Sequence, residues 1–425
     1  MGRIGHGTAV LLSGAVLTIL VWCGSCSSER GRPAAATQPA APDVPLVRVR
    51  LHAAAQSIRL RATATPTVKV ASRKPLRLTI APGAPATLAL TDEGWTIGGV
   101  RVPGGSEELT LWPSEDASIS IDDRAYRGSF RFVPTGEANS FDVVNDVDID
   151  SYLQGVLARE LYRSWHEETY RAQAIVARTY ALYQARMADR ARHWDLYPDQ
   201  RSQVYGGVQD ESSRSRRAVE DTAGIVLAYG QPGEERIFKT YFSACCGGVT
   251  QSAADAFGEP YVVPLSDQDA HGLCSPAPRF NWGPVEISKA ELTRRLRLYG
   301  ERRSPGARHI QSLSRLEIQS ANRFNRPIRF VAIDADGTRY SLLGEELRNA
   351  VNGFATKEQP QRLHSSFVKV VNEPGSDVIR FVEGHGHGHG VGMCQWCSQL
   401  RAEAGMQHED IVLSGFPRSK LVRAY

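Results

Sequence analysis

Several features are scarce or missing in this sequence of 425 residues, and each absence argues against a class of protein. The 50 Lys and Arg residues barely exceed the 46 Asp and Glu residues, which argues against a dedicated nucleic-acid binder. No Gly-Lys-Ser/Thr step occurs, so a phosphate-binding P-loop is excluded. The apolar run AVLLSGAVLTILVW (9–22) has only 14 residues, too few to span a bilayer comfortably as a mature helix.

The N-terminus instead has the order of an export signal. An Arg precedes the apolar run, and small residues Gly24 and Ser25 stand directly before Cys26, as in a bacterial lipoprotein cleavage box. We therefore expect residues 1–26 to direct export, ending in a lipidated cysteine, a plain cleavage site or an uncleaved anchor. The Pro/Ala-rich residues 27–45 predict a semi-rigid linker. The expected location is the cell envelope, on a membrane anchor that faces the periplasm or the cell wall.

Residues 46–138 predict a small all-β module. Short alternating runs such as VRVRL, SIRLRAT and YRGSFRFV are separated by Pro, Gly and Asp, and no helical pattern interrupts them. The module has no cysteine and a single histidine, His52. We expect no catalytic chemistry from it.

Residues 139–425 predict a domain of mixed structure. Apolar residues at helical spacing predict one helix that Asp150 caps and a second helix from about Glu167 to Met187. Strand-like runs such as GIVLAY, LSRLEIQ and IRFVAID follow, without an internal repeat. A helical hairpin followed by mostly antiparallel strands predicts the α+β fold class.

Three residues of the predicted hairpin could carry chemistry. Glu160 ends the first helix in ARELYRSW, close in sequence to Tyr162 and Trp165. A carboxyl held against apolar and aromatic surface has a raised pKa and can donate a proton near neutral pH, although a surface glutamate is the alternative. Gln173 and Arg178 are polar residues on an otherwise apolar second helix, and Arg178 either binds a ligand or makes an ion pair.

Cysteines gather in the second domain. If Cys26 carries lipid, the folded part keeps an odd number of cysteines, which cannot all form intrachain disulfides. Adjacent Cys245 and Cys246 rarely bond to each other. One of this pair with the other three would supply the thiolate-rich tetrahedron that zinc prefers, and His389 or His271 could replace one thiolate. Disulfides in an oxidising envelope, or free thiols, are the alternatives. The tentative metal ligands are Cys245, Cys246, Cys274, Cys394 and Cys397.

Several ordered blocks of this domain resemble one known family. They read VDIDSYLQGVLARELYRSWHEETYRAQAIVARTYAL, DLYPDQRSQVYGG, DTAGIVLAY, YFSACCGGVT and GHGVGMCQW, with GFPRSKLVRAY at the end. Together they resemble the stage II sporulation protein D family, also called the SpoIID/LytB or amidase-enhancer family. The resemblance covers about residues 141–425.

The resemblance implies an activity and a set of site residues. It implies a lytic transglycosylase that cleaves MurNAc–GlcNAc bonds of peptidoglycan, notably in strands stripped of stem peptides, and leaves 1,6-anhydro-MurNAc ends. The family's catalytic glutamate falls on Glu160. A single acid–base carboxyl requires no cofactor for catalysis, and the expected partner is peptidoglycan, not nucleic acid. The residues that would bind the glycan are Gln173, Arg178, Tyr180, Gln203, Tyr205, Gly247, Gly248, His389 and Gln395.

The family name also implies an alternative from another class, a non-catalytic glycan-binding protein that stimulates a cell-wall amidase. A third hypothesis is a zinc-dependent hydrolase built on the His/Gly run from His385 to His389. Some family members bind zinc through Cys and His, but this sequence has Cys394 and Cys397 where the family has Ser and Gly. The ligand positions therefore do not transfer, and a structural zinc remains an expectation from the cysteines alone. Sporulation is not inferred from the family name.

Overall fold

The computed structural model describes residues 44–71, 74–77, 83–114, 117–303 and 306–425. The predicted export segment and nearly all of the predicted linker lie outside these residues. None of the described helices is both long enough and apolar enough to cross a membrane.

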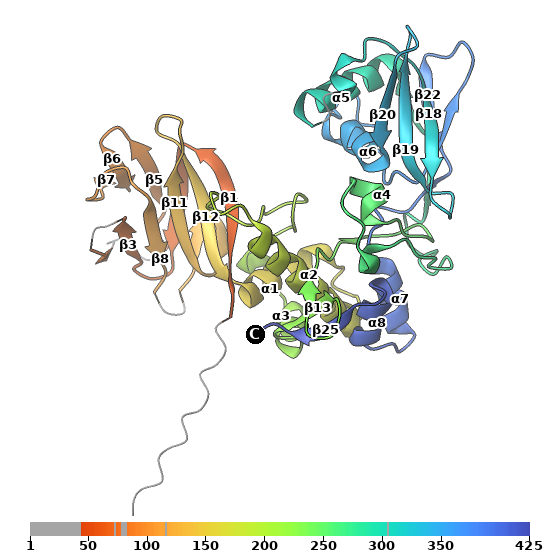
Figure 1. Ribbon diagram of the computed structural model, residues 1–425. Helices are drawn as coiled ribbons and strands as arrows, with labels where there is room; N and C mark the ends of the chain where they lie inside the picture. Colours follow the sequence, from red (N-terminus) through yellow and green to blue (C-terminus); the bar gives the residue numbers. More distant parts are fainter. Residues whose placement is uncertain (1–43, 72–73, 78–82, 115–116, 304–305) are drawn as a thin grey trace, which may run out of the picture. The chain divides into compact units, whose positions relative to one another are not determined.

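The N-terminal part consists of two antiparallel six-stranded sheets (Figure 1). Their strands alternate buried and exposed residues, as in SIRLRA of β2, because successive side chains point to opposite faces of a sheet. The first sheet has the order β1 (Leu46–Ala55), β12 (Phe141–Asp148), β11 (Ser129–Pro134), β8 (Leu109–Trp112), β3 (Thr67–Val70) and β4 (Leu76–Arg77). The second has the order β10 (Arg124–Tyr126), β9 (Ile119–Ile121), β2 (Ser57–Ala62), β5 (Ala86–Thr91), β6 (Gly94–Ile97) and β7 (Val100–Arg101).

Strand β12 connects these sheets to the helices. It pairs with both β1 and β11, so the strand that follows the predicted boundary at residue 138 completes the N-terminal sheet. Its side chains are buried almost without a break, and they share one hydrophobic cluster with the helical hairpin. The start of the hairpin is therefore fixed directly by the sheet.

The hairpin consists of α1 (Ile149–Glu160) and α2 (Glu167–Met187), and α2 has the bounds that its apolar spacing predicts. The prediction that Asp150 caps α1 is wrong. Asp148 is the N-cap, and its carboxylate accepts a hydrogen bond from the backbone N–H of Ser151 (2.8 Å). Fourteen residues of α2 are buried, so this helix is covered on most sides instead of presenting one apolar stripe.

The remaining chain forms small sheets and short helices, so the α+β class with a helical hairpin and mostly antiparallel strands is confirmed. Only β15 and β24 pair in parallel among the named strands of the described residues. The strands are grouped by sheet as β13 (Ile225–Tyr229), β14 (Arg236–Ile237) and β25 (Lys420–Arg423); β15 (Phe242–Ser243) and β24 (Met393–Cys394); β16 (Asn281–Trp282) and β23 (Gly384–His385); β17 (Val285–Ser288), β22 (Val378–Val382) and β21 (Lys369–Asn372); β18 (Leu313–Ala321), β19 (Pro327–Asp334) and β20 (Arg339–Leu343). The helices are α3 (Ser213–Asp221), α4 (Ala253–Phe257), α5 (Lys289–Arg302), α6 (Gly344–Gly353), α7 (Gln395–Glu403) and α8 (His408–Gly415), with short 3₁₀ turns at Val208–Asp210, Val263–Leu265 and Ala307–His309.

Candidate active site

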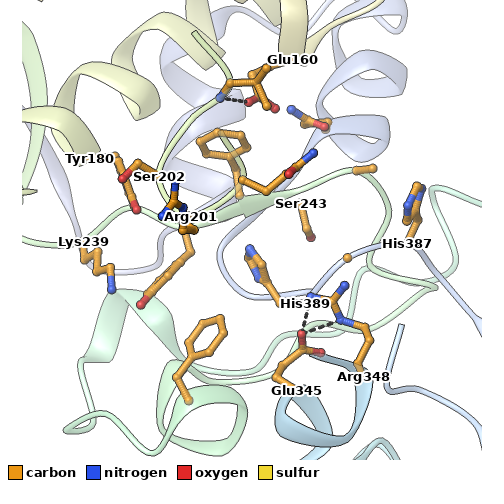
Figure 2. Close-up of a pocket in the computed structure, with 18 of the residues that line it drawn as sticks. Glu160, Tyr180, Arg201, Ser202, Lys239, Ser243, Glu345, Arg348, His387 and His389 are labelled. Carbon is orange, nitrogen blue, oxygen red and sulfur yellow. Dashed lines mark hydrogen bonds and ion pairs between the residues drawn. The ribbon is translucent and has the colours of Figure 1, made fainter. Parts of the chain in front are cut away.

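A cavity of about 700 Å³ opens beside the C-terminal end of α1 (Figure 2). Its walls come from seven separate parts of the sequence, and Glu160 lies on one side with the Glu345–Arg348 pair opposite. The lining residues that matter below are Glu160, Tyr180, Lys239, Glu259, Glu345, Arg348, His387, His389 and Gln395.

A second cavity of about 310 Å³ adjoins the first. The two share four lining residues, namely Glu160, Ala244, His387 and Gln395. Three aromatic side chains line the second cavity and pack against one another: Tyr162, Trp165 and Trp396, with ring centroids 5.2–6.3 Å apart. Glu160 therefore lies where the two hollows meet, with space on either side of its carboxyl.

The environment of Glu160 raises the pKa of its carboxyl. Burial is the main cause, because it disfavours the charged form. The backbone N–H of Val204 donates to Oε1 (3.1 Å), and this bond and the Gln395 side chain oppose the shift, as does the charge of Arg159, without cancelling it. A carboxyl with a raised pKa that keeps one hydrogen-bond donor can both give and take a proton near neutrality.

Local backbone geometry presents this carboxyl to the cavity. Helix α1 ends because Leu161 is extended (φ −123°, ψ 151°), which places Glu160 in the last turn. Opposite it, residues 202–205 alternate: Ser202 and Val204 line the cavity, whereas Gln203 and Tyr205 are buried. From this segment the backbone N–H of Val204 donates to the Glu160 carboxylate.

The other two carboxylates of the first cavity are engaged by cations. Glu259 pairs with Lys239 (3.0 Å) and accepts a hydrogen bond from the Tyr241 hydroxyl (2.6 Å). Glu345 is buried; burial alone raises its pKa, but the nearby Arg348 outweighs burial and lowers it. Of the carboxyls that line the two cavities in the described residues, Glu160 alone has no ion pair and a raised pKa.

The histidines of the His/Gly run do not behave as one unit. His387 and His389 line the first cavity, whereas His385 packs against Phe280 and Phe367. Burial lowers the pKa of His389 to about 4, so its ring is neutral at neutral pH. In the part of the chain that the structure describes, no histidine joins a group of three or more metal-ligating side chains, which argues against a zinc hydrolase centred on this run.

Three of the nine residues predicted to bind glycan line the first cavity: Tyr180, His389 and Gln395. Gln173 is buried behind them, and its side-chain oxygen accepts a hydrogen bond from Gln395 (3.4 Å). Gln203 is bonded instead to the hydroxyl of Tyr152 (3.2 Å) and the carbonyl of Ala177. The structure thus divides the predicted set into a lining group and a buried supporting group.

The structure does not bring Arg178 to the cavity. Its guanidinium is completely buried and donates to Asp150, Tyr425 and Thr222, and to backbone carbonyls. Of the two roles that the sequence suggests for Arg178, a ligand contact or an ion pair, the structure contains the ion pair. Tyr205 is likewise a core residue, whose hydroxyl donates to Asn145 (3.1 Å).

Gly247 and Gly248 also lie outside the two sets of lining residues. Gly247 has φ 74°, and a Cβ there would lie 2.8 Å from the backbone nitrogen of Gly386. A glycine at this position lets the CCGG turn and the His/Gly run approach each other closely. The glycine-rich stretches shape the cavity wall through their neighbours Ala244, His387 and Gly388.

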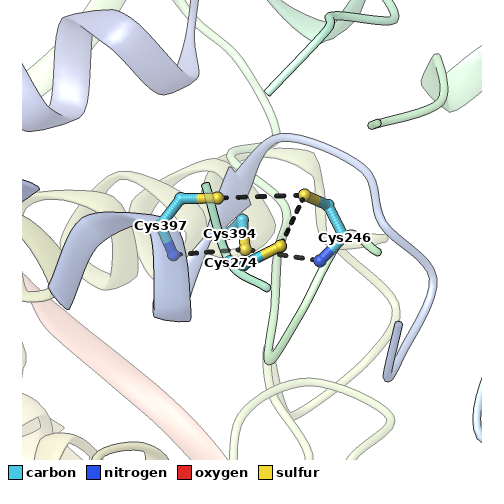
Figure 3. Close-up of side chains that lie close together, drawn as sticks. All are labelled: Cys246, Cys274, Cys394 and Cys397. Carbon is cyan, nitrogen blue, oxygen red and sulfur yellow. Dashed lines mark hydrogen bonds between the residues drawn. The ribbon is translucent and has the colours of Figure 1, made fainter. Parts of the chain in front are cut away.

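Four of the five predicted cysteine ligands come together: Cys246, Cys274, Cys394 and Cys397 have sulfurs within 4.8 Å of one another (Figure 3). Cys245 is not in this group and lines the second cavity.

Several lining residues were missed from the sequence. Lys239, Glu259 and Arg348 lie in stretches without a motif, so no signal marked them. The three aromatic residues of the second cavity did have a sequence signal. Trp396 lies inside the Cys-x-x-Cys, next to Gln395, and Tyr162 and Trp165 follow Glu160 closely.

Comparison with known proteins finds a family model that matches the segment carrying Glu160. The profile of the family described as "Stage II sporulation protein", SpoIID, matches residues 137–229, which include α1, α2 and Glu160. An uncharacterized protein of Brachyspira hyodysenteriae is 28% identical over 315 residues, or 74% of this chain and 76% of that protein. The amidase enhancer of Bacillus subtilis is 24% identical over 338 residues, or 71% of this chain but only 45% of that protein. The segment that carries Glu160 is therefore similar to the SpoIID family.

Proposed function

We propose that this protein acts on the bacterial cell wall as a peptidoglycan lytic transglycosylase, with Glu160 as its only acid–base. The match to the SpoIID family model and the similarity to an amidase enhancer support the cell-wall role. The observation that carries the finer proposal is the position of Glu160, an unpaired carboxyl with a raised pKa at the junction of two cavities.

The two cavities suit a polymer that passes the carboxyl. A glycan strand that is cut internally needs sugar subsites on both sides of the broken bond. The first cavity offers polar side chains for hydroxyl and amide groups, and the second offers the faces of Tyr162, Trp165 and Trp396 for the apolar faces of sugar rings. Arg201, Lys239 and Arg348 line the first cavity, and each already pairs with one carboxylate of the protein. Their remaining N–H groups suit the lactyl carboxylate that MurNAc exposes once its stem peptide is removed.

One carboxyl suffices for the proposed chemistry. Protonated Glu160 donates its proton to the bridging oxygen as the bond from MurNAc C1 breaks, and the GlcNAc hydroxyl leaves. The resulting carboxylate accepts the proton of the MurNAc C6 hydroxyl while O6 bonds to C1, which closes the 1,6-anhydro ring and restores the acid. Hydrolytic glycosidases usually use two carboxyls, and here Glu259 and Glu345 are held by cations.

The test is product analysis with the purified full-length protein. We expect 1,6-anhydro-MurNAc ends by mass spectrometry when it is incubated with denuded glycan, and at least a thousand-fold loss of rate in Glu160→Gln, since the general acid and base are one group. Glu167→Gln, an exposed substitution at the start of α2, is the control. Full activity of Glu160→Gln would exclude this mechanism.

A second candidate is favoured by the amidase enhancer of Bacillus subtilis among the relatives. A non-catalytic enhancer would bind glycan in the same groove and stimulate a separate cell-wall amidase. It predicts no anhydro products from the protein alone and increased stem-peptide release when an amidase is added. The two readouts therefore separate the candidates in one experiment.

A further inference from the structure

The four clustered cysteines come from three distant segments. Cys246 belongs to the CCGG turn, Cys274 to the loop after residue 270, and Cys394 and Cys397 to the start of α7. All four are buried. The Sγ atoms of Cys246 and Cys274 are 3.5 Å apart, and those of Cys246 and Cys397 are 3.9 Å apart (Figure 3).

These separations match one metal ion better than four independent thiols. Zinc binds thiolates at about 2.3 Å in a tetrahedron, which sets neighbouring sulfurs about 3.8 Å apart. The Cys-x-x-Cys spacing at the start of a helix supplies two such ligands from one turn. Because the four sulfurs are mutually within 4.8 Å, all of them can reach one central ion.

Backbone donors surround the sulfur of Cys394. The N–H groups of Cys246 (3.3 Å) and Cys397 (3.4 Å) both point to it, and Cys394 is also the N-cap of α7. Backbone N–H bonds and a helix N-terminus stabilise a thiolate over a thiol. Backbone N–H groups of this kind hold a ligating sulfur in place in metal sites.

A buried arginine balances the charge that such a site would have. Arg326 is 1% exposed, and its guanidinium donates to the carbonyls of Cys246 (3.0 Å), Val249 (3.0 Å) and His389 (2.9 Å). Among the described residues it forms no ion pair within salt-bridge distance, and Glu345, whose charge acts on it, is paired with Arg348. A buried cation needs compensation, and four thiolates around Zn²⁺ carry a net charge of −2.

The cluster also holds one wall of the second cavity. Gln395 and Trp396 lie between two of the cysteines, Arg279 follows Cys274 by five residues, and Cys245 precedes Cys246. All four of these neighbours line the second cavity. One ion bound to the cluster would therefore fix three separate segments of the groove beside Glu160.

We propose that this protein binds one structural zinc ion through a tetrathiolate site made of Cys246, Cys274, Cys394 and Cys397. Cys245 stays outside the ligand set and keeps a free thiol in the second cavity. The site is separate from the acid–base step, so it stands or falls independently of the transglycosylase activity. Its role is to hold the groove wall that carries Gln395 and Trp396.

The test measures metal directly on the full-length protein without an affinity tag. We expect one zinc per chain by elemental mass spectrometry, loss of at least nine-tenths of that zinc in Cys274→Ser, and retention of it in the matched variant Cys245→Ser. Comparing variants with the parent protein cancels any contribution of Cys23 and Cys26. If Cys274→Ser fails to fold, Co²⁺-substituted parent protein replaces it, and an intense sulfur-to-cobalt charge-transfer band indicates a thiolate site.

Three results would overturn the proposal. The first is a zinc-free protein whose intact mass under non-reducing conditions reveals disulfides among these cysteines. The second is loss of zinc in Cys245→Ser, which would mean a different ligand set. The third is a cobalt spectrum without thiolate charge transfer.

Discussion

Arg178 on α2 and Asp150 on α1 form an ion pair (Nη2 to Oδ1, 3.0 Å) in which the guanidinium is completely buried. The hydroxyl of Tyr425, the last residue, donates to the same carboxylate oxygen (2.8 Å). Two helices and the C-terminal end of the chain thus meet at one carboxylate. This junction fixes the first turn of α1, the helix whose last turn presents Glu160.

We expect Asp150→Asn to destabilise the protein by about 3 kcal/mol, because it leaves the buried Arg178 charge without its partner. Asp148→Asn is the matched control, since asparagine caps a helix about as well as aspartate, and its cost stays within about 1 kcal/mol. Urea unfolding measures both variants. Equal losses in the two variants would contradict a special role for the pair.

The Glu160→Gln variant tests how much the raised pKa of Glu160 lowers the stability of the folded protein. The folded-state pKa of Glu160 lies above its unfolded value, so its effect on stability is most favourable below the unfolded pKa and worsens as pH rises through the folded pKa. Glutamine keeps the bond from Val204 and does not ionise. We expect the variant to be more stable than the parent at neutral pH and to lose that advantage near pH 4. Thermal unfolding across pH measures this difference, and a difference that does not change with pH would mean that Glu160 is an ordinary surface residue.

Part of this fold follows from local sequence. Helix α2 has the predicted bounds from Glu167 to Met187, because its apolar spacing and its flanking residues agree. The N-cap of α1 could not be predicted from local sequence. Asp148 and Asp150 are equivalent candidates in sequence, and only tertiary contacts pair Asp150 with Arg178. A single polar residue on an apolar helix signals burial with a partner as readily as it signals a ligand.

The candidate site was only partly predictable for the same reason. Glu160 stands beside aromatic residues in sequence, and that neighbourhood correctly indicated a raised pKa. By contrast, Glu259 reaches the cavity from the loop after α4 and Arg348 reaches it from α6, and no local sequence pattern encodes how these segments pack. The cysteine group shows the limit most clearly: composition indicated a cluster, but which member of the Cys245–Cys246 pair belongs to it depends on backbone direction in the folded turn.

Gln395 tunes the pKa of Glu160. Its side chain favours the carboxylate, so Gln395→Ala removes an effect that lowers this pKa. We expect the basic limb of the pH–rate profile to move to higher pH, because the acid stays protonated longer. Gln407→Ala, an exposed substitution before α8, controls for expression and should leave the profile in place. A shift to lower pH would contradict this interaction.

Tyr162 should contribute to glycan binding rather than to folding. Its side chain is 60% exposed and lines the second cavity, so truncation removes a surface for a sugar ring. We expect Tyr162→Ala to weaken binding of a soluble denuded glycan about five-fold, equivalent to about 1 kcal/mol, with little change in melting temperature. Tyr261→Ala is the control, since Tyr261 is 64% exposed and lines neither cavity. Equal glycan affinity of the two variants in calorimetry would contradict an aromatic sugar subsite at Tyr162.

Glu168 joins the start of α2 to the start of α8 and should make stability depend on acid. Burial alone raises its pKa, but hydrogen bonds from the backbone N–H (2.8 Å) and ring (2.7 Å) of His408, with the charge of Arg171, outweigh burial and lower it. A lowered folded-state pKa contributes stability that is present above the unfolded pKa and is lost as pH falls through the folded pKa.

We therefore expect Glu168→Gln to cost about 2 kcal/mol of stability at pH 7 and almost nothing at low pH, where the parent carboxylate is itself protonated. The neighbouring Glu167→Gln, at an exposed ion pair, should cost less than about 0.5 kcal/mol at either pH. Denaturant unfolding at both pH values measures the difference, and a penalty for Glu168→Gln that does not change with pH would mean that packing, not charge, holds α8 to α2.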